Sequence, residues 1–110
     1  MNTSYFAKSS THPEAVSIAA KAPKGYKGRE YKALAPKYWF FKKYKEDGDS
    51  VFYTEQYRKE VLDQLDPKKV YEELGENAVL LCWEGKGKFC HRRLVADWFK
   101  EKLNTEVPEL

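Results

Sequence analysis

The chain has 110 residues, of which 42% are hydrophobic and 34% are charged, and its formal net charge is +3. This length predicts a single domain over residues 1–110 with one modest core, and the composition excludes a disordered chain. No apolar run approaches the roughly 20 residues that span a bilayer, and the Met1-Asn2-Thr3 start lacks the pattern of a secretion signal, so we expect no membrane contact and a cytoplasmic location.

Two short strands are predicted near the N-terminus. Residues 3–7 combine aromatic and small side chains, and residues 15–19 place Val16 and Ile18 on one face. The polar stretch between them holds His12 directly before a proline, where an exposed imidazole is commoner than a ligand or a base.

A basic segment follows, and it shows neither helical nor strand periodicity between residues 21 and 35. Nine basic residues and one acid, Glu30, lie between Lys21 and Lys45, so this segment carries +8 while the remainder carries −5. Such a segregated charge indicates an anionic partner, and Tyr31 within the loop could stack on a flat ring. A solvated lysine-rich loop is the alternative interpretation.

Three helices are predicted in the middle of the chain, over residues 37–45, 54–65 and 67–74. Pro36 suits the first turn of the first helix, Thr54 is a plausible N-cap for the second, and Asp66 caps the third, which Gly75 ends. The five aromatic side chains of the first helix are expected in the core, with stacking on a ligand as the sharper alternative.

The best strand in the sequence runs over residues 78–83, and its apolar side chains on both faces predict a central strand covered by helices. A helix over residues 91–103 follows after a short loop, Asn104 can end it, and Val107 could join a last short strand. A strand, a short loop and a helix form half of a βαβ unit. We therefore predict an α/β fold with a mainly parallel sheet of three to four strands covered by helices.

The loop between this strand and this helix is the predicted binding site, because ligands of parallel sheets settle at the carboxyl ends of the strands. Lys86 and Lys88 lie in the glycine-containing loop, and Arg92 and Arg93 lie in the first helical turn, where the helix dipole also favours an anion. These four cations are the predicted contacts of an anionic ligand.

Cys90 is the predicted nucleophile. A cysteine at a helix N-terminus beside arginines can have its pKa lowered from about 8.5 to between about 3.5 and 7.5; capping the helix or packing beneath the loop is the alternative. Cys82, within the apolar run, is expected to be buried and inert. Two cysteines eight positions apart, in a chain with no secretion signal, are interpreted as reduced thiols and not as a structural disulfide.

His91 and Glu84 are the predicted acid and base groups. Neighbouring helical residues diverge by about 100°, so His91 is expected to serve a substrate or pair with Glu84, and not to activate Cys90 directly. Glu84 is either a base with a raised pKa or, the preferred interpretation, an ion-pair partner of Arg92 or Arg93.

A zinc site is conceivable, because Cys82, Cys90 and His91 are three suitable ligands. A fourth ligand is absent nearby, and the spacing is not that of a zinc finger or ribbon. We therefore predict neither a metal nor a cofactor.

The string Leu80-Leu81-Cys82-Trp83-Glu84, followed after a short loop by Cys90-His91-Arg92, resembles the signature of a prokaryotic and phage family, domain-of-unknown-function family number four hundred and eighty-eight. Looser similarity lies at residues 4–7, 16–18, 34–36 and 53–57. The resemblance implies an α/β domain with its site around Glu84, Cys90, His91 and Arg92, and it implies no particular reaction.

The leading functional hypothesis is a pocket for a phosphate-bearing ligand, a nucleotide or a nucleic-acid end. The sequence leaves open whether the protein is an enzyme; if it is one, the expected reaction is transfer or hydrolysis at a phosphorylated or glycosidic centre through a cysteine thiolate. The alternative is a non-enzymatic module, encoded by a phage or a prokaryote, that binds nucleic acid or a nucleotide. A purely structural partner protein is a third hypothesis. The sequence does not predict the oligomeric state.

Overall fold

A single parallel sheet organises the computed structural model, which describes residues 1–110. The strands are ordered β1-β4-β2-β3, and every neighbouring pair is parallel. They span Asn2–Tyr5 (β1), Ala15–Ser17 (β2), Arg29–Glu30 (β3) and Val79–Cys82 (β4). The predicted α/β fold with a parallel sheet is therefore confirmed, and the apolar run of residues 78–83 supplies an inner strand as expected.

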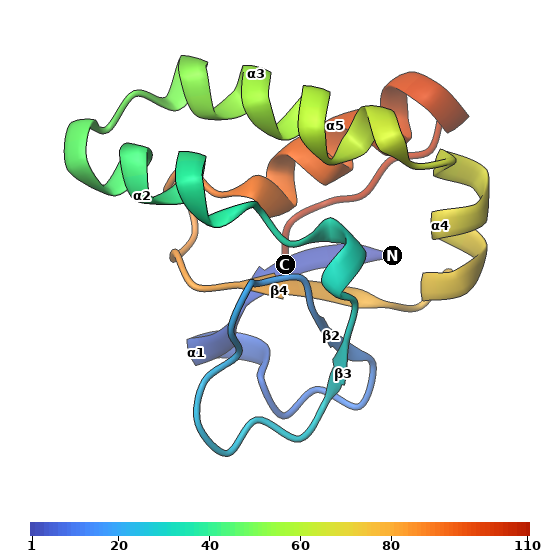
Figure 1. The fold of residues 1–110 in the computed structure, drawn as a ribbon. Coiled ribbons are helices and arrows are strands. Elements are labelled where there is room, and N and C mark those ends of the chain that lie inside the picture. Colours follow the sequence, from blue (N-terminus) through green and yellow to red (C-terminus); the bar gives the residue numbers. More distant parts are fainter.

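Both faces of β4 are covered, which explains why its side chains are apolar throughout. Leu80 packs into the larger hydrophobic cluster, whereas Val79 and Leu81 point to the opposite face and join a smaller cluster with Phe6. Figure 1 shows the longer helices above the sheet and the short first helix below it, beside the loop that follows β2.

Five α-helices accompany the sheet, and they span Phe6–Ser9 (α1), Tyr38–Asp47 (α2), Ser50–Glu60 (α3), Pro67–Leu74 (α4) and His91–Leu103 (α5). Asp66 caps α4 as predicted, and Asn104 ends α5 in the left-handed region with φ of 52°. The predicted start of the middle helix was wrong. Asp49 caps α3 by accepting from the Phe52 amide, whereas the Thr54 hydroxyl donates to the Ser50 carbonyl inside the helix.

Both ends of the chain differ from the prediction. The first strand stops at Tyr5, because Phe6 begins α1 and is buried in the smaller cluster. Near the C-terminus, Val107 is buried but forms no strand; the tail joins β1 through an isolated bridge between Thr3 and Glu109. The two termini consequently lie near each other (Figure 1).

The basic loop is partly ordered by backbone pairing. It contains the two-residue strand β3 and a 3-10 turn over Lys32–Leu34, where no regular element was predicted. None of the helices has both the length and the apolar character needed to cross a membrane.

Candidate functional site

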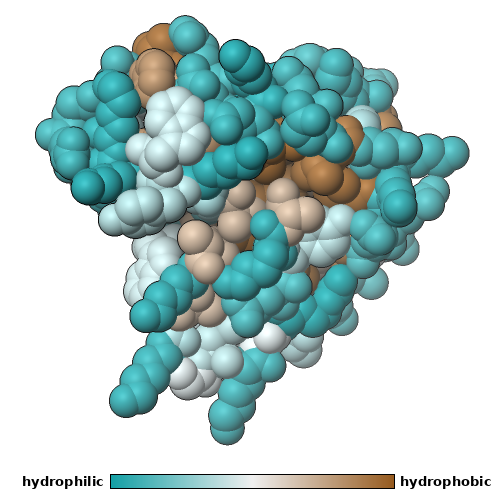
Figure 2. All heavy atoms as spheres, viewed as in Figure 1, coloured by the Kyte–Doolittle hydropathy of each residue, from teal (hydrophilic) through white to brown (hydrophobic).

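A cleft of about 320 Å³ lies at the carboxyl ends of β2 and β4, between the sheet and α2. Its walls are aromatic side chains from α2, α3 and the loop after β4, namely Tyr38, Phe41, Tyr44, Tyr53, Trp83 and Phe89. Its polar lining groups include Lys21, Glu84 and His91. In Figure 2, pale and brown atoms gather in the middle of the displayed face, between a mostly hydrophilic upper part and long hydrophilic chains that project below.

The two cysteines meet at the end of this cleft and form a disulfide. The prediction of two reduced thiols is therefore wrong for this structure. β4 ends at Cys82, and the following loop brings the chain back to the same edge of the sheet at Cys90, with 7.1 Å between the two Cα atoms. Both side chains are buried, and both line the cleft.

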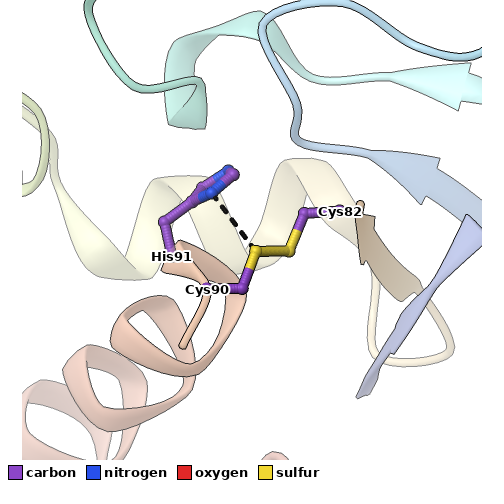
Figure 3. A group of neighbouring side chains, drawn as sticks. All are labelled: Cys82, Cys90 and His91. Atoms are coloured by element: carbon purple, nitrogen blue, oxygen red, sulfur yellow. Dashed lines mark hydrogen bonds between the residues drawn. A yellow bond between two sulfur atoms is a disulfide. The ribbon is translucent and has the colours of Figure 1, made fainter. Parts of the chain in front are cut away.

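His91 lies directly against this disulfide, from the first residue of α5 (Figure 3). Its Nδ1 is 3.7 Å from the Cys90 sulfur, so the expectation that the two side chains diverge is wrong. The expectation assumed helical geometry for both residues. Cys90 is the N-cap and has an extended backbone, with φ of −157° and ψ of 149°, which brings the two neighbouring side chains to the same side.

The hydrogen bonds of His91 define its tautomer. Nε2 is 2.7 Å from the Ile18 carbonyl oxygen, which can only accept, so Nε2 carries the proton. Burial lowers the pKa of His91 to about 4, with the Ile18 carbonyl and Glu84 opposing the shift and Arg92 adding to it. At neutral pH the ring is therefore uncharged, and the lone pair of Nδ1 faces the Cys90 sulfur.

Arg92 is fully buried, and all three of its nitrogen atoms donate within the protein. Nε and Nη2 bind the Glu109 carboxylate, with the shortest distance 2.7 Å, and Nη1 and Nη2 bind the carbonyl oxygens of Glu84 and Gly85. Nη1 also lies 3.1 Å from the Cys82 sulfur. Arg92 thus anchors α5 to the end of β4 and to the C-terminal tail, and it leaves no donor directed at a ligand.

Arg93 binds the first strand and the C-terminal tail. Its Nη1 donates to the Thr3 hydroxyl and to the Val107 carbonyl oxygen, both at 2.8 Å. It therefore joins α5 to β1 and to the tail, and it does not line the cleft. The two arginines predicted to bind an anionic ligand are instead used to assemble the fold.

The remaining predicted ligand contacts lie outside the cleft lining. Lys86 and Lys88 are exposed in the loop between β4 and α5, and their ammonium groups make no hydrogen bond or ion pair within the chain. Tyr31 donates from its hydroxyl to the Glu73 carboxylate at 2.5 Å, away from this cleft. The structure therefore does not bring Tyr31 together with the cysteines.

Glu84 does line the cleft, but its ion pair differs from the predicted one. Its carboxylate lies 3.3 Å from the Lys45 ammonium group of α2, and only its main-chain oxygen accepts from Arg92. The preference for an Arg92 or Arg93 ion pair is therefore wrong, because the strand end directs the side chain toward α2. Glu84 faces the cleft as a carboxylate at the same end as His91.

Three aromatic residues of the cleft wall, Tyr53, Trp83 and Phe89, were not predicted from the sequence as part of the site. Tyr53 is the central one: it packs against Tyr44 and Phe89 with ring centroids 5.5 and 5.2 Å apart, and it stacks on Tyr57, which in turn contacts His91. Burial raises the pKa of Tyr53, so its hydroxyl stays protonated. The sequence feature that could have indicated an aromatic site is the cluster of aromatic residues in the first long helix, which was interpreted mainly as part of the core.

Metal binding at this site would require reduction. Cys82, Cys90 and His91 offer ligand atoms that all lie within 4.8 Å of one another. A metal binds cysteine as a thiolate, and neither sulfur has that form while the disulfide is intact. The present geometry is that of a disulfide with a neutral imidazole beside it.

A comparison with protein families identifies the chain. Residues 6–103 match the model described as "Active DUF488-N3 subclade", so the chain belongs to this family, in agreement with the Cys-His-Arg signature. Comparisons with curated proteins and with solved structures find no match.

Proposed function

We propose that this member of the DUF488-N3 subclade binds a nucleotide or the end of a nucleic acid in the aromatic cleft, and that reduced Cys90 attacks the ligand with His91 as its proton acceptor. The observation that carries the proposal is the 3.7 Å approach of the neutral Nδ1 of His91 to the Cys90 sulfur inside this cleft. A nucleophile beside an oriented base is the general arrangement of covalent catalysis.

The cleft suits a flat heterocyclic ring. Its volume of about 320 Å³ is near the lower end of small-molecule pockets, and aromatic walls with few polar groups are typical of sites that enclose a base. Lys21 at the cleft supplies a cation for an attached phosphate, and the unpaired Lys86 and Lys88 extend from the loop that borders it. Arg92 and Arg93 have no part in this version of the hypothesis.

The chemistry begins with reduction of the Cys82–Cys90 bond by a cellular thiol. Nδ1 of His91 then accepts the Cys90 proton, and the sulfur attacks a glycosidic carbon or a phosphorus atom. A bond from sulfur to that atom forms, and the leaving group departs with the proton held by His91. A water molecule then gives a proton to His91 and attacks the same atom, which breaks the bond to sulfur and releases the Cys90 thiolate. The chain belongs to the subclade described as active, which supports an enzyme, and a reducing cytoplasm would keep the site in its thiol form.

The test uses the full chain with and without a thiol reductant. Reduced protein is mixed with the common ribonucleotides and deoxyribonucleotides, and binding is measured by calorimetry while products are followed by mass spectrometry. We expect binding, followed by turnover that requires reductant and disappears in Cys90→Ser, while Cys90→Ser retains binding. Failure of every nucleotide to bind the reduced protein would contradict the proposal.

A non-enzymatic binding module is the second candidate, and one observation favours it. The disulfide occupies both sulfur atoms, so the chain in this state has no free thiol. For such a module, nucleotides would bind equally well with and without reductant, and no product would form under either condition.

A further inference from the structure

A second hollow lies on the other side of Trp83, outside the cleft described above. It encloses about 850 Å³ and is formed by α1, the turn after it and residues 23–28 of the basic loop. Trp83 is the one residue that lines both hollows. The two spaces therefore meet at the indole ring of Trp83.

The lining of this second hollow contains no carboxylate. Lys24 and Lys27 are exposed on its wall and pair with no group of the protein, in contrast to Arg29, which donates to the Glu73 and Leu74 carbonyl oxygens. His12, also on the wall, accepts from the Glu14 amide through Nδ1, which leaves Nε2 as a free donor. The hollow thus presents donors and cations without opposing anions.

Trp83 is held in a fixed orientation although 54% of it is exposed. Its Nε1 donates to the Lys21 carbonyl oxygen at 2.9 Å, and its ring meets Phe6 edge to face at 5.2 Å. An exposed aromatic ring with a fixed orientation loses little entropy when a base stacks on it. The same hydrogen bond ties the start of the basic loop to the boundary between the two hollows.

We infer that the second hollow is the path of a single-stranded nucleic acid whose terminal base enters the aromatic cleft. Trp83 stacks on a base at the junction, and Lys21, Lys24 and Lys27 follow the phosphates from one hollow to the other. Stacking on Trp83 requires unpaired bases, which favours a single strand over a duplex. The occupant of the cleft rests on the proposed function, whereas the lysine-lined path does not.

The test measures fluorescence anisotropy of a labelled single-stranded oligonucleotide of about six nucleotides, a length typical for one small binding domain. We expect the oligonucleotide to bind about tenfold or more tightly than the mononucleotide. In Lys24→Gln/Lys27→Gln, oligonucleotide affinity should fall by about tenfold while mononucleotide affinity is unchanged. The dependence of log affinity on log salt should become shallower by about 1.4, for two lost phosphate contacts.

The matched control is Lys68→Gln/Lys69→Gln, which removes the same charge from exposed positions on α4. It should change oligonucleotide affinity by less than about twofold. Trp83→Leu should weaken oligonucleotide binding by about tenfold. If Trp83→Leu fails to fold, which its circular dichroism would reveal, the lysine variants still decide the matter.

The outcomes separate the path from the function of the cleft. Equal losses in the two lysine pairs, equal binding of a duplex of the same length, or equal affinities of oligonucleotide and mononucleotide would each overturn the inference. Lysine-dependent oligonucleotide binding without any mononucleotide binding would support the path and contradict the proposed function of the cleft.

Discussion

Two neighbouring residues at the start of α5 belong to regions of opposite character. Arg92 enters a buried polar anchor, defined here as Arg92, Arg93, Glu109 and Thr3, which joins the helix to β1 and the C-terminal tail. His91 enters the aromatic cleft, where it has one carbonyl partner and faces a sulfur atom. The arginines of the motif are thus used for assembly, whereas its uncharged imidazole ring lines the cleft.

This difference shows how a basic motif at a helix N-terminus can be misinterpreted. The positive end of a helix and two arginines predict an anion, and an anion is indeed there, but it is the Glu109 carboxylate of the same chain. Burial alone would raise the pKa of Glu109, yet the hydrogen bonds from Arg92 and Thr3 lower it. The charged groups of the buried polar anchor are therefore paired with one another and need no ligand.

The largest expected effect comes from breaking this anchor. Arg92→Met removes the charged partner of the buried Glu109 carboxylate and two donors to main-chain carbonyl oxygens, so the free energy of unfolding should fall by about 3–5 kcal/mol. Urea denaturation followed by circular dichroism measures the change.

The control for this variant is Arg58→Met. Arg58 pairs with Glu101 on the surface at 3.3 Å, and exposed pairs contribute at most about 1 kcal/mol. If both variants lose the same stability, Arg92 is not the anchor described here.

In the cleft, His91 should make the stability of the protein depend on pH. Burial lowers the pKa of His91 from 6.5 to about 4, so the unfolded chain binds a proton more readily than the folded chain. The stability contributed by the neutral ring is complete above about pH 6.5 and is lost as the pH falls toward 4, for a total of about 3 kcal/mol. Urea denaturation at a series of pH values between 4 and 8 measures this loss.

Substitution of each histidine shows which one causes the dependence of the free energy of unfolding on pH. His91→Gln should reduce the loss of stability over this pH range, whereas His12→Gln, at an exposed turn, should leave it unchanged. An unchanged slope in His91→Gln would mean that His91 is not the titrating group.

Much of the fold was predictable because local signals and tertiary packing agree. The doubly apolar run of residues 78–83 could be satisfied only inside a covered sheet, and Asp66, Pro67 and Gly75 define the ends of α4 by backbone chemistry alone. Phe6 is the counterexample. Its strand propensity is overridden because burial under β4 is gained from a helical turn.

The structure brings three of the predicted site residues, Glu84, Cys90 and His91, into one cleft. The partners of Arg92, Arg93 and Glu84 differ from those expected. No local pattern shows that Glu109, seventeen residues after Arg92, returns to neutralise it, or that Cys90 adopts an extended backbone that turns it toward His91. Tyr53 was not predicted at the site for the same reason, because α3 reaches the cleft only through the packing of the helices.

Reduction of the disulfide is expected to have a smaller effect than loss of the anchor. The bond closes a loop between residues eight positions apart, for which the chain-entropy model gives a stabilisation of about 2–3 kcal/mol. Thermal unfolding with and without a phosphine reductant should show this difference in the native chain and none in Cys82→Ala/Cys90→Ala. A native chain that unfolds identically under both conditions would contradict a disulfide in solution.

The smallest expected effect concerns the one ion pair of the cleft. Lys45 and Glu84 are 3.3 Å apart and partly exposed, so Lys45→Gln should lower the free energy of unfolding by less than about 1 kcal/mol. Lys42→Gln, on the same helix and without a partner, is the matched control for the removed charge. A loss as large as that of Arg92→Met would place Lys45 and Glu84 in the structural framework. A small loss would instead show that folding does not depend on this ion pair. The Glu84 carboxylate would then be available to contact a ligand in the cleft.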